Sequence, residues 1–239
     1  MCGRFHLRTD AVALVQKFLP NMVAAELPAV PPRYNIAPTQ PVLSVLADRE
    51  GRRSVRFLRW GLVPPWADSL VIGSRMVNAR CETAAEKRSF REPFAKRRCL
   101  VPATGYYEWQ VLADGTKQPM HIHRPDDPLF AMAGLWERNT IADPEGREVV
   151  SCTLLTTEAN QATAAVHDRM PVILDQAGVD RWLAADTEPA ELQALCRPAP
   201  NRPWVVQPVS RRVNKPRFDD PACLEPESLP KQRSLFEIE

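Results

Sequence analysis

The alternation of apolar and polar residues predicts a mixture of short strands and short helices. Apolar side chains recur at helical spacing over residues 11–18, and Thr9 or Asp10 is a suitable N-terminal cap. Residues 42–46 and 55–60 have the character of strands joined by a glycine turn, which predicts a hairpin. Further strands are expected at 98–101, 106–112, 119–123, 129–136, 149–156, 172–174 and 204–209.

Helices are expected between these strands. Residues 83–90 carry a helical pattern that should end before Pro93, since proline disfavours a helical conformation in the residue that precedes it. A second pattern at 159–166 predicts a short helix that ends at His167. The remaining helical segments are expected at 180–185 and 189–195.

The order of these elements predicts the fold class. Strands and helices interleave without a regular βαβ period, which favours an α+β fold. We expect a single compact domain at residues 1–217, with a curved, barrel-like mixed sheet and peripheral helices. Residues 218–239 are rich in acids and proline, so we expect them to form a loose acidic C-terminal tail.

Composition and charge narrow the function classes. The 239 residues are 44% apolar and 25% charged, and no apolar run approaches the roughly 20 residues that cross a bilayer. No export signal is expected to accompany the six cysteines, which favours reduced thiols in the cytoplasm. Residues 75–98 carry eight basic residues against three acids, a cluster that suits either a solvated face or a polyanion. We expect a monomer that needs no membrane and no cofactor.

The N-terminus offers unusual chemistry. Loss of Met1 would leave Cys2 with an α-amine and a thiol, both of which titrate near neutral pH. Such a 1,2-aminothiol can act as an N-terminal nucleophile in amide hydrolysis. It can also condense with an aldehyde to an imine that the thiol closes to a five-membered thiazolidine. A third interpretation is that Cys2 is merely a small residue after the start.

Other polar residues supply candidate acids and bases. Glu108 lies between aromatic residues in a predicted strand, where a carboxylate must be paired with an arginine or protonated. His167 follows a predicted helix and can serve either as its cap or in proton transfer. His121 and His123 would share one strand face, but no third ligand at suitable spacing accompanies them, so no metal site is expected.

Six separated segments together resemble the SRAP family, the SOS-response-associated peptidases, which shield abasic sites in DNA. The resemblance covers residues 1–217 and implies a compact α+β domain with a curved sheet. A series of this length in the expected order is highly specific. The segments are MCGRF at 1–5, RYNIAPTQ at 33–40, RWGLVPPWA at 59–67, NARCET at 78–83, GYYEW at 105–109 and HDRMP at 167–171.

The resemblance implies covalent chemistry on single-stranded DNA. Cys2 would capture the ring-opened aldehyde of an abasic site as a stable thiazolidine crosslink. Asn78 matches the family's active-site amide, Glu108 the general acid/base of imine formation, and His167 a second acid/base. Lyase activity at abasic sites and self-removal of Met1, the peptidase activity, are also implied. Such a protein would work in the cytoplasm and join the nucleoid when bound to DNA.

A second group of residues is expected to hold the DNA strand. Arginine contacts phosphate through two nitrogens, and flat side chains stack on unpaired bases. For the two tryptophans, ordinary core packing is the alternative interpretation. The expected DNA-binding residues are Arg4, Pro38, Trp66, Arg80, Trp109 and Arg169.

Two other functions remain open from the residues. N-terminal-nucleophile glutamine amidohydrolases also begin Met-Cys-Gly, but the Asn-Gly pair that helps to build their oxyanion hole is absent here. A non-catalytic single-strand-binding module, in which Cys2 is incidental, is the third. A heat-stable band with abasic DNA, glutaminase turnover, or reversible binding alone would distinguish the three.

Overall fold

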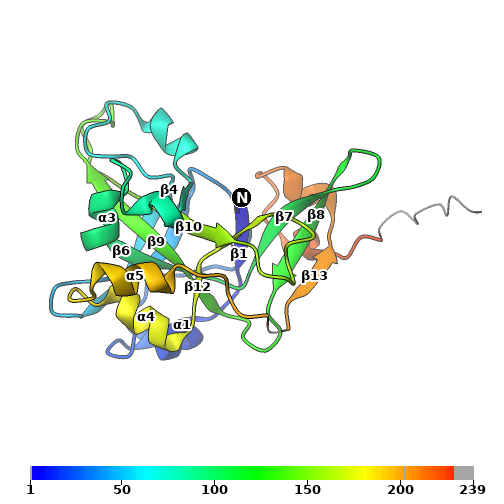
Figure 1. Cartoon of the computed structure of the whole chain (residues 1–239), viewed down its shortest axis with the longest axis horizontal. Helices are drawn as coiled ribbons and strands as arrows, with labels where there is room; N and C mark the ends of the chain where they lie inside the picture. The colour runs from blue at the N-terminus through cyan, green and yellow to red at the C-terminus, as the bar shows by residue number, and fades with distance from the viewer. Residues whose placement is uncertain (1, 202, 229–239) are drawn as a thin grey trace, which may run out of the picture.

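The computed structural model describes residues 2–201 and 203–228, and two β-sheets form its frame (Figure 1). The strands are β1 (Arg4–Leu7), β2 (Arg33–Ile36), β3 (Pro41–Ala47), β4 (Arg53–Trp60), β5 (Asn78–Arg80), β6 (Arg98–Ala103), β7 (Gly105–Val111), β8 (Lys117–His123), β9 (Phe130–Asn139), β10 (Val149–Glu158), β11 (Arg169–Pro171), β12 (Ile173–Leu174) and β13 (Val205–Pro208). The helices are α1 (Ala11–Phe18), α2 (Cys81–Ala84), α3 (Arg91–Lys96), α4 (Gln176–Leu183) and α5 (Pro189–Leu195), with 3₁₀ turns η1 (Ala24–Glu26), η2 (Leu70–Arg75), η3 (Arg211–Asn214) and η4 (Pro221–Leu224).

The larger sheet closes on itself. Within the described part of the chain, β10, β4, β3, β6 and β9 pair in that order, and β9 pairs back with β10. The β10–β4 pairing is parallel and the others are antiparallel, so the ring is a mixed barrel. Helices α3 and α4 pack against its outer surface (Figure 1). This confirms the predicted α+β domain with a barrel-like mixed sheet.

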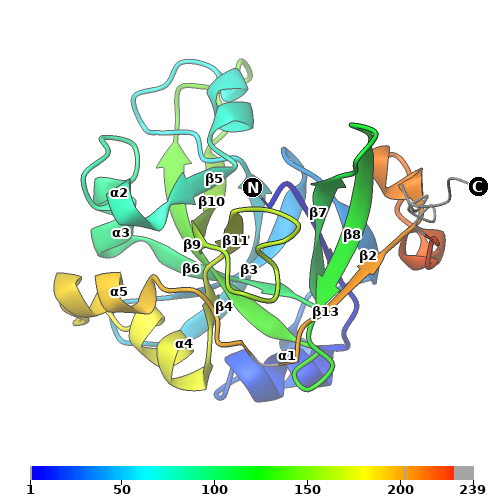
Figure 2. The same ribbon diagram turned by 45° about the vertical axis from the view of Figure 1, so that its right-hand side comes forward.

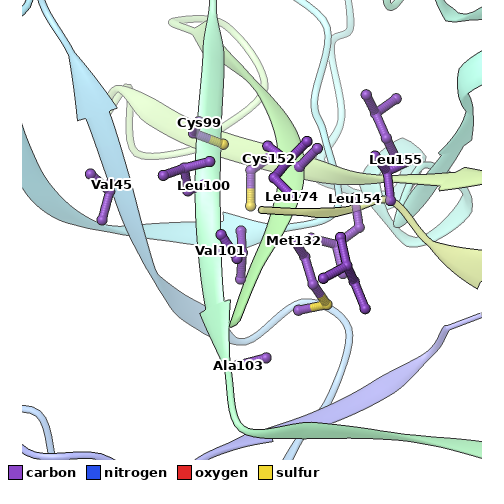
Figure 3. Packing of buried hydrophobic residues seen from close by; sticks show 14 of the residues in the cluster. Val45, Cys99, Leu100, Val101, Ala103, Met132, Cys152, Leu154, Leu155 and Leu174 are labelled. Carbon is purple, nitrogen blue, oxygen red and sulfur yellow. The ribbon is translucent and has the colours of Figure 1, made fainter. Parts of the chain in front are cut away.

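The interior of the barrel is apolar. Strand pairing puts Val101, Met132, Cys152 and Leu154 on one face, where they are fully buried, and Leu100 is buried on the opposite face; Figure 3 shows these side chains. Interiors packed in this way resist deformation, so the barrel gives the attached strands fixed positions. None of the described helices has the length and apolar character needed to cross a membrane.

The smaller sheet lies beside the barrel (Figure 2) and has the order β13-β8-β7-β1-β2. Strand β1 is held between β2 and β7, with Phe5 opposite both Ile36 and Tyr106. The first residues of the chain are therefore central to this sheet. The predicted hairpin at 42–60 is confirmed as β3–β4, and the strands predicted at 106–112 and 119–123 pair with each other as β7 and β8.

Asp10 caps α1 as predicted, accepting a hydrogen bond from the Ala13 amide at 2.7 Å. Two other helix predictions are wrong. The segment 83–90 is not one helix: α2 ends at Ala84 and α3 begins at Arg91, with Pro93 in its first turn, where the missing amide hydrogen is tolerated. Residues 161–166 form turns rather than a helix, where Asn160 accepts the Thr163 amide at 3.1 Å.

The expectation of a loose tail is wrong for residues 218–228. Cys223 is fully buried and Phe218 and Leu224 pack beside it, because the apolar residues of this segment cover Tyr107. The carboxylate of Asp219 accepts the backbone amides of Tyr34 and Asn35 at 2.5 and 2.8 Å, which ties the segment to β2. The rest of the predicted tail, 229–239, lies outside the described residues.

Candidate active site

Cys2 lies where the two sheets meet. Its side chain is fully buried, and its carbonyl oxygen accepts a hydrogen bond from Asn78 Nδ2 at 2.8 Å. Asn78 begins β5, which runs parallel to β10 of the barrel with Asn78 opposite Leu154. The barrel thus positions the side-chain amide of Asn78 on the backbone of Cys2. Met1 itself lies outside the described residues.

The GYYEW segment divides its side chains between two faces because successive residues of a strand point in opposite directions. Tyr107 and Trp109 belong to the apolar cluster with Cys223, on the side of the C-terminal segment. Tyr106 and Glu108 lie on the opposite face of β7. Both interact electrostatically with the Cys2 thiol. Tyr106 was not among the predicted site residues, although its spacing from Glu108 indicates the shared face.

Burial controls the ionisation of this group. It raises the pKa of Glu108, whose side chain is buried, although the neighbouring His167 opposes the shift. Burial, reinforced by the Glu108 carboxylate, also raises the pKa of the Cys2 thiol. Both groups are therefore biased towards their protonated forms. A carboxyl that keeps its proton closer to neutral pH is suited to general acid catalysis.

His167 lies near Glu108 and is positioned by a strand of the larger sheet. It stands just before β11, which pairs with β10, and its Nδ1 accepts the backbone amide of Arg169 at 3.0 Å. Asp168 Oδ1 is 2.8 Å from the same nitrogen. The Asp168 carboxylate calls for a proton on Nδ1, whereas the Arg169 amide calls for a lone pair there, so the two contacts belong to different protonation states of the ring.

A shallow pocket of about 400 Å³ joins these groups to the surface, lined by Glu108, Trp109, Lys117 and His167. Lys117 begins β8, directly opposite Val111 on β7, and is exposed. Lys117 was not among the predicted site residues, because it lies eight residues beyond the nearest recognised segment, which ends at Trp109. The turn that joins β7 to β8 brings it to the mouth of the pocket.

Three of the predicted DNA-binding residues lie on accessible surface. Arg80 is exposed at the end of β5, two residues after Asn78. Trp66 is 43% exposed, and the guanidinium of Arg88 lies 4.9 Å from the centre of its ring. Pro38 is half-buried in the turn after β2. These positions are compatible with contacts to an extended strand.

The other three are engaged with protein groups. Arg4 is buried, and its Nη1 donates to Asn35 Oδ1 at 2.8 Å and to the Val213 carbonyl at 2.6 Å. These contacts fix its guanidinium within the domain, and its predicted contact with DNA stays a prediction. Trp109 is half-buried, and its Nε1 donates to Asn214 Oδ1 at 2.7 Å.

Arg169 is also engaged. It forms a two-pronged ion pair with Glu82 at 2.7 and 2.8 Å and donates to the Thr156 carbonyl at 2.7 Å. Its side chain is 11% exposed. Because its backbone amide also holds His167, this geometry gives Arg169 a positioning role.

The histidines of the smaller sheet form a hydrogen-bonded group. His121 and His123 share a strand face, as predicted, and their rings stack with centres 4.3 Å apart. His121 Nε2 is 2.7 Å from His6 Nε2, and Thr104 Oγ1 is 2.8 Å from His6 Nδ1. A side chain on Gly105 would come within 2.6 Å of His121 Nε2, so the motif glycine leaves room for this pair. Among the described residues, no group of three or more potential ligands is placed to hold a metal ion.

Comparison with known proteins identifies the family of this chain. The sequence profile of the SOS response associated peptidase (SRAP) family matches residues 1–216. This chain belongs to the SRAP family. Abasic site processing protein YoqW of Bacillus subtilis is 41% identical over 94% of this chain and 99% of its own length.

More distant relatives share the SRAP domain. Abasic site processing protein YedK of Escherichia coli is 30% identical over 95% of this chain and 100% of its own length. HMCES of Rattus norvegicus is 32% identical over 96% of this chain and 77% of its own. A crystal structure of a Bacteroides thetaiotaomicron protein superposes with a TM-score of 0.81, at 27% identity, over 95% of this chain and 100% of that one.

Proposed function

We propose that this SRAP protein processes abasic sites in single-stranded DNA by forming a thiazolidine crosslink through Cys2. The observation that carries the proposal is the buried Glu108, which acts electrostatically on the Cys2 thiol and also lines a pocket that opens to the surface. The names of the relatives, which are abasic site processing proteins, support the choice of substrate.

The chemistry begins with the free amine of Cys2, after hydrolysis of the Met1–Cys2 peptide bond at the same site. The amine attacks the aldehyde carbon of the opened deoxyribose and forms a carbinolamine, which loses water to give an imine. The thiol then adds to the imine carbon, so that a C–S bond forms and the sulfur proton moves to nitrogen. The product has no C=N bond left to hydrolyse.

Glu108 is the acid that this sequence requires. Loss of water from the carbinolamine needs a proton on the departing hydroxyl, and the raised pKa of Glu108 favours the form that carries one. After donation, the carboxylate can accept the thiol proton when the ring closes. Since the Glu108 charge itself opposes thiolate formation, transfer is favoured only as the C–S bond forms.

The barrel supplies the groups that hold the sugar and its phosphates. His167 can protonate the ring oxygen and so assist opening of the deoxyribose to its aldehyde. Arg80 is placed to contact a phosphate on one side of the pocket, and Lys117 on the other. If the imine forms and ring closure fails, loss of the proton next to it cuts the strand, which accounts for an associated lyase activity.

Membership of the SRAP family favours this function over the glutamine amidohydrolase that also begins Met-Cys-Gly. The binding-module alternative predicts no covalent product, so one experiment separates them. The full-length protein is incubated with an abasic single-stranded oligonucleotide and resolved by denaturing electrophoresis and intact mass. We expect a heat-stable adduct whose mass is that of protein without Met1 plus oligonucleotide, less one water.

Two controls isolate the functional groups. An oligonucleotide with a tetrahydrofuran in place of the abasic sugar has no aldehyde and should bind without crosslinking. Cys2→Ser keeps the amine, so it should form only an imine that borohydride traps, and no heat-stable adduct. A protein fused at its N-terminus has no amine on Cys2, and a heat-stable crosslink from that fusion would refute the mechanism.

A further inference from the structure

Two further cysteines, Cys81 and Cys196, lie close together beside the strand that carries Asn78. Cys81 is the first residue of α2 and directly follows Arg80, while Cys196 caps the C-terminal end of α5. The Cys81 thiol donates to the carbonyl oxygen of Cys196 at 3.5 Å, and the two thiols influence each other's ionisation. Gln193 on α5 donates to the Cys81 carbonyl at 3.4 Å. The C-terminal end of α5 is thus hydrogen bonded to the first residue of α2.

The surroundings favour ionisation of one thiol of the pair. The hydrogen bond from Cys196 lowers the pKa of Cys81 against the effect of burial, and the Thr157 hydroxyl and the Arg169 guanidinium act in the same direction. Glu82 opposes them, but it is ion-paired with Arg169. The same contact with Cys81 raises the pKa of Cys196. Cys81 is therefore the nucleophile and Cys196 the thiol that keeps its proton.

The cysteines of the barrel offer an internal comparison. Cys99 and Cys152 are also neighbours, but both are fully buried among apolar side chains (Figure 3). Burial raises the pKa of Cys99 and raises that of Cys152 to about 12. Cys81 is buried too, whereas Cys196 is partly exposed, so the pair at 81 and 196 has a side open to small molecules.

We propose that Cys81 and Cys196 form a peroxide-responsive dithiol that closes to a disulfide. The Cys81 thiolate attacks one oxygen of hydrogen peroxide, which breaks the O–O bond and gives a sulfenic acid and hydroxide. The Cys196 thiol then attacks the sulfenic sulfur, and the S–S bond forms with release of water. Both sulfurs are oxidised and the peroxide is reduced to two waters overall.

The disulfide would change the molecule without consuming Cys2. It would join positions 81 and 196, which lie 115 residues apart, and so fix the end of β5 to α5. A crosslink that closes a loop of this length restricts the unfolded chain, which should raise Tm by roughly 5–15 °C. β5 also carries Asn78, so the oxidised form would hold the site more rigidly.

The test uses the full-length wild-type protein. It is treated with hydrogen peroxide, its remaining thiols are alkylated under denaturing conditions, and tryptic peptides are mapped. We expect the peptide with Cys81 to be joined to the peptide with Cys196, while Cys99 and Cys152 remain alkylated. A reductant should reverse the joining and the increase in Tm together.

Cys196→Ser is the matched variant. It lacks the resolving thiol, so Cys81 should accumulate as a sulfenic acid that dimedone traps, and peroxide should no longer raise Tm. Full alkylation of Cys81 and Cys196 after a treatment that oxidises free cysteine in the same tube would overturn the proposal. So would a map in which Cys81 is joined to any other cysteine. Neither readout involves DNA, so the result is independent of crosslinking to abasic sites.

Discussion

The two sheets of this protein differ in what they bury. The barrel buries apolar residues such as Val101 and Met132 together with a Glu137 that is ion-paired with Arg97. The smaller sheet buries His6, His121 and Glu108, whose pKa values are shifted mainly by burial. The barrel is closed and has no free edge among its five strands within the described residues. The smaller sheet is open and joins two of its buried polar groups, His6 and His121, by a hydrogen bond.

The candidate site takes one half from each sheet. The smaller sheet provides Cys2 and Glu108, the groups whose pKa values burial shifts. The barrel provides Asn78 and His167 through strands that pair with β10. In the proposed mechanism, the groups with shifted pKa values therefore come from the smaller sheet, and the barrel fixes the positions of the groups beside them. Substitutions of the same residue type in the two sheets should therefore have different consequences.

The largest effect should come from Glu108→Gln. The amide cannot deliver a proton to the carbinolamine, so crosslink formation should slow by about 10²–10⁴ fold. Single-turnover electrophoresis with an abasic oligonucleotide measures this. Glu137→Gln is the matched control, because Glu137 is also buried but lies in the barrel and is ion-paired with Arg97 at 2.6 Å. It should alter stability and leave the crosslinking rate unchanged; equal rates for both variants would contradict the assignment.

The next effect concerns acid stability. Burial lowers the pKa of His121 from 6.5 to about 3. Below pH 6.5 the unfolded chain binds a proton that the folded protein does not, so stability is complete above that pH and is lost as pH falls towards 3. Between pH 7 and pH 5 the loss should be on the order of 2 kcal/mol. Urea unfolding at both pH values should show a weaker pH dependence for His121→Gln; an unchanged dependence would argue against the histidine group.

A third prediction concerns binding rather than chemistry. Arg80→Ala should weaken single-strand binding by about 1–3 kcal/mol and flatten its dependence on salt. Arg56→Ala is the matched control, since Arg56 is exposed on β4 of the barrel, away from the pocket residues. Fluorescence titrations at several salt concentrations report both quantities. Equal losses for the two variants would show a diffuse electrostatic attraction in place of a local contact.

The smallest effect is expected for Asn78→Ala. The variant loses the hydrogen bond to the Cys2 carbonyl, which is worth about 0.5–1.5 kcal/mol, so capture should slow by roughly 2–12 fold. Asn139→Ala in the barrel removes hydrogen bonds to Pro64 and Ala67 and should cost stability with no change in capture. If Asn139→Ala slowed capture more than Asn78→Ala does, the proposed roles of the two residues would be contradicted.

Much of this arrangement was predictable because it is local in sequence. The spacing of Ala11, Leu14 and Phe18 predicts α1, and alternation predicts the hairpin β3–β4 and the strands β7 and β8, which agree with the structure. The division of the GYYEW side chains between two faces also follows from alternation. The predicted helix at 83–90 failed since Pro93 was taken as the end of a helix, when it stands in the first turn of the next one.

Contacts between distant segments were beyond the sequence pattern. The closure of β9 on β10, the parallel pairing of β5 with β10 and the seating of Cys196 on Cys81 join residues that no local rule connects. Arg4 is an example: the motif suggested a contact with phosphate, and the sequence pattern did not show that its guanidinium donates to Asn35 and to the Val213 carbonyl. Roles assigned from the family to Cys2, Asn78, Glu108 and His167 await the experiments above.

The bond between Arg4 and the carbonyl of Val213 has a consequence for synthesis. Ribosomes add about 5–20 residues per second, so position 213 follows position 4 by roughly 10–40 s. During that interval β1 lacks the segment that anchors its arginine, and the first residues of a nascent chain are unfolded peptide. The aminothiol, the carboxylate and the pocket are brought together only when translation is nearly finished. In the proposed mechanism Met1 is removed at this same site, so the amine of Cys2 would become free only after the pocket that directs it has formed.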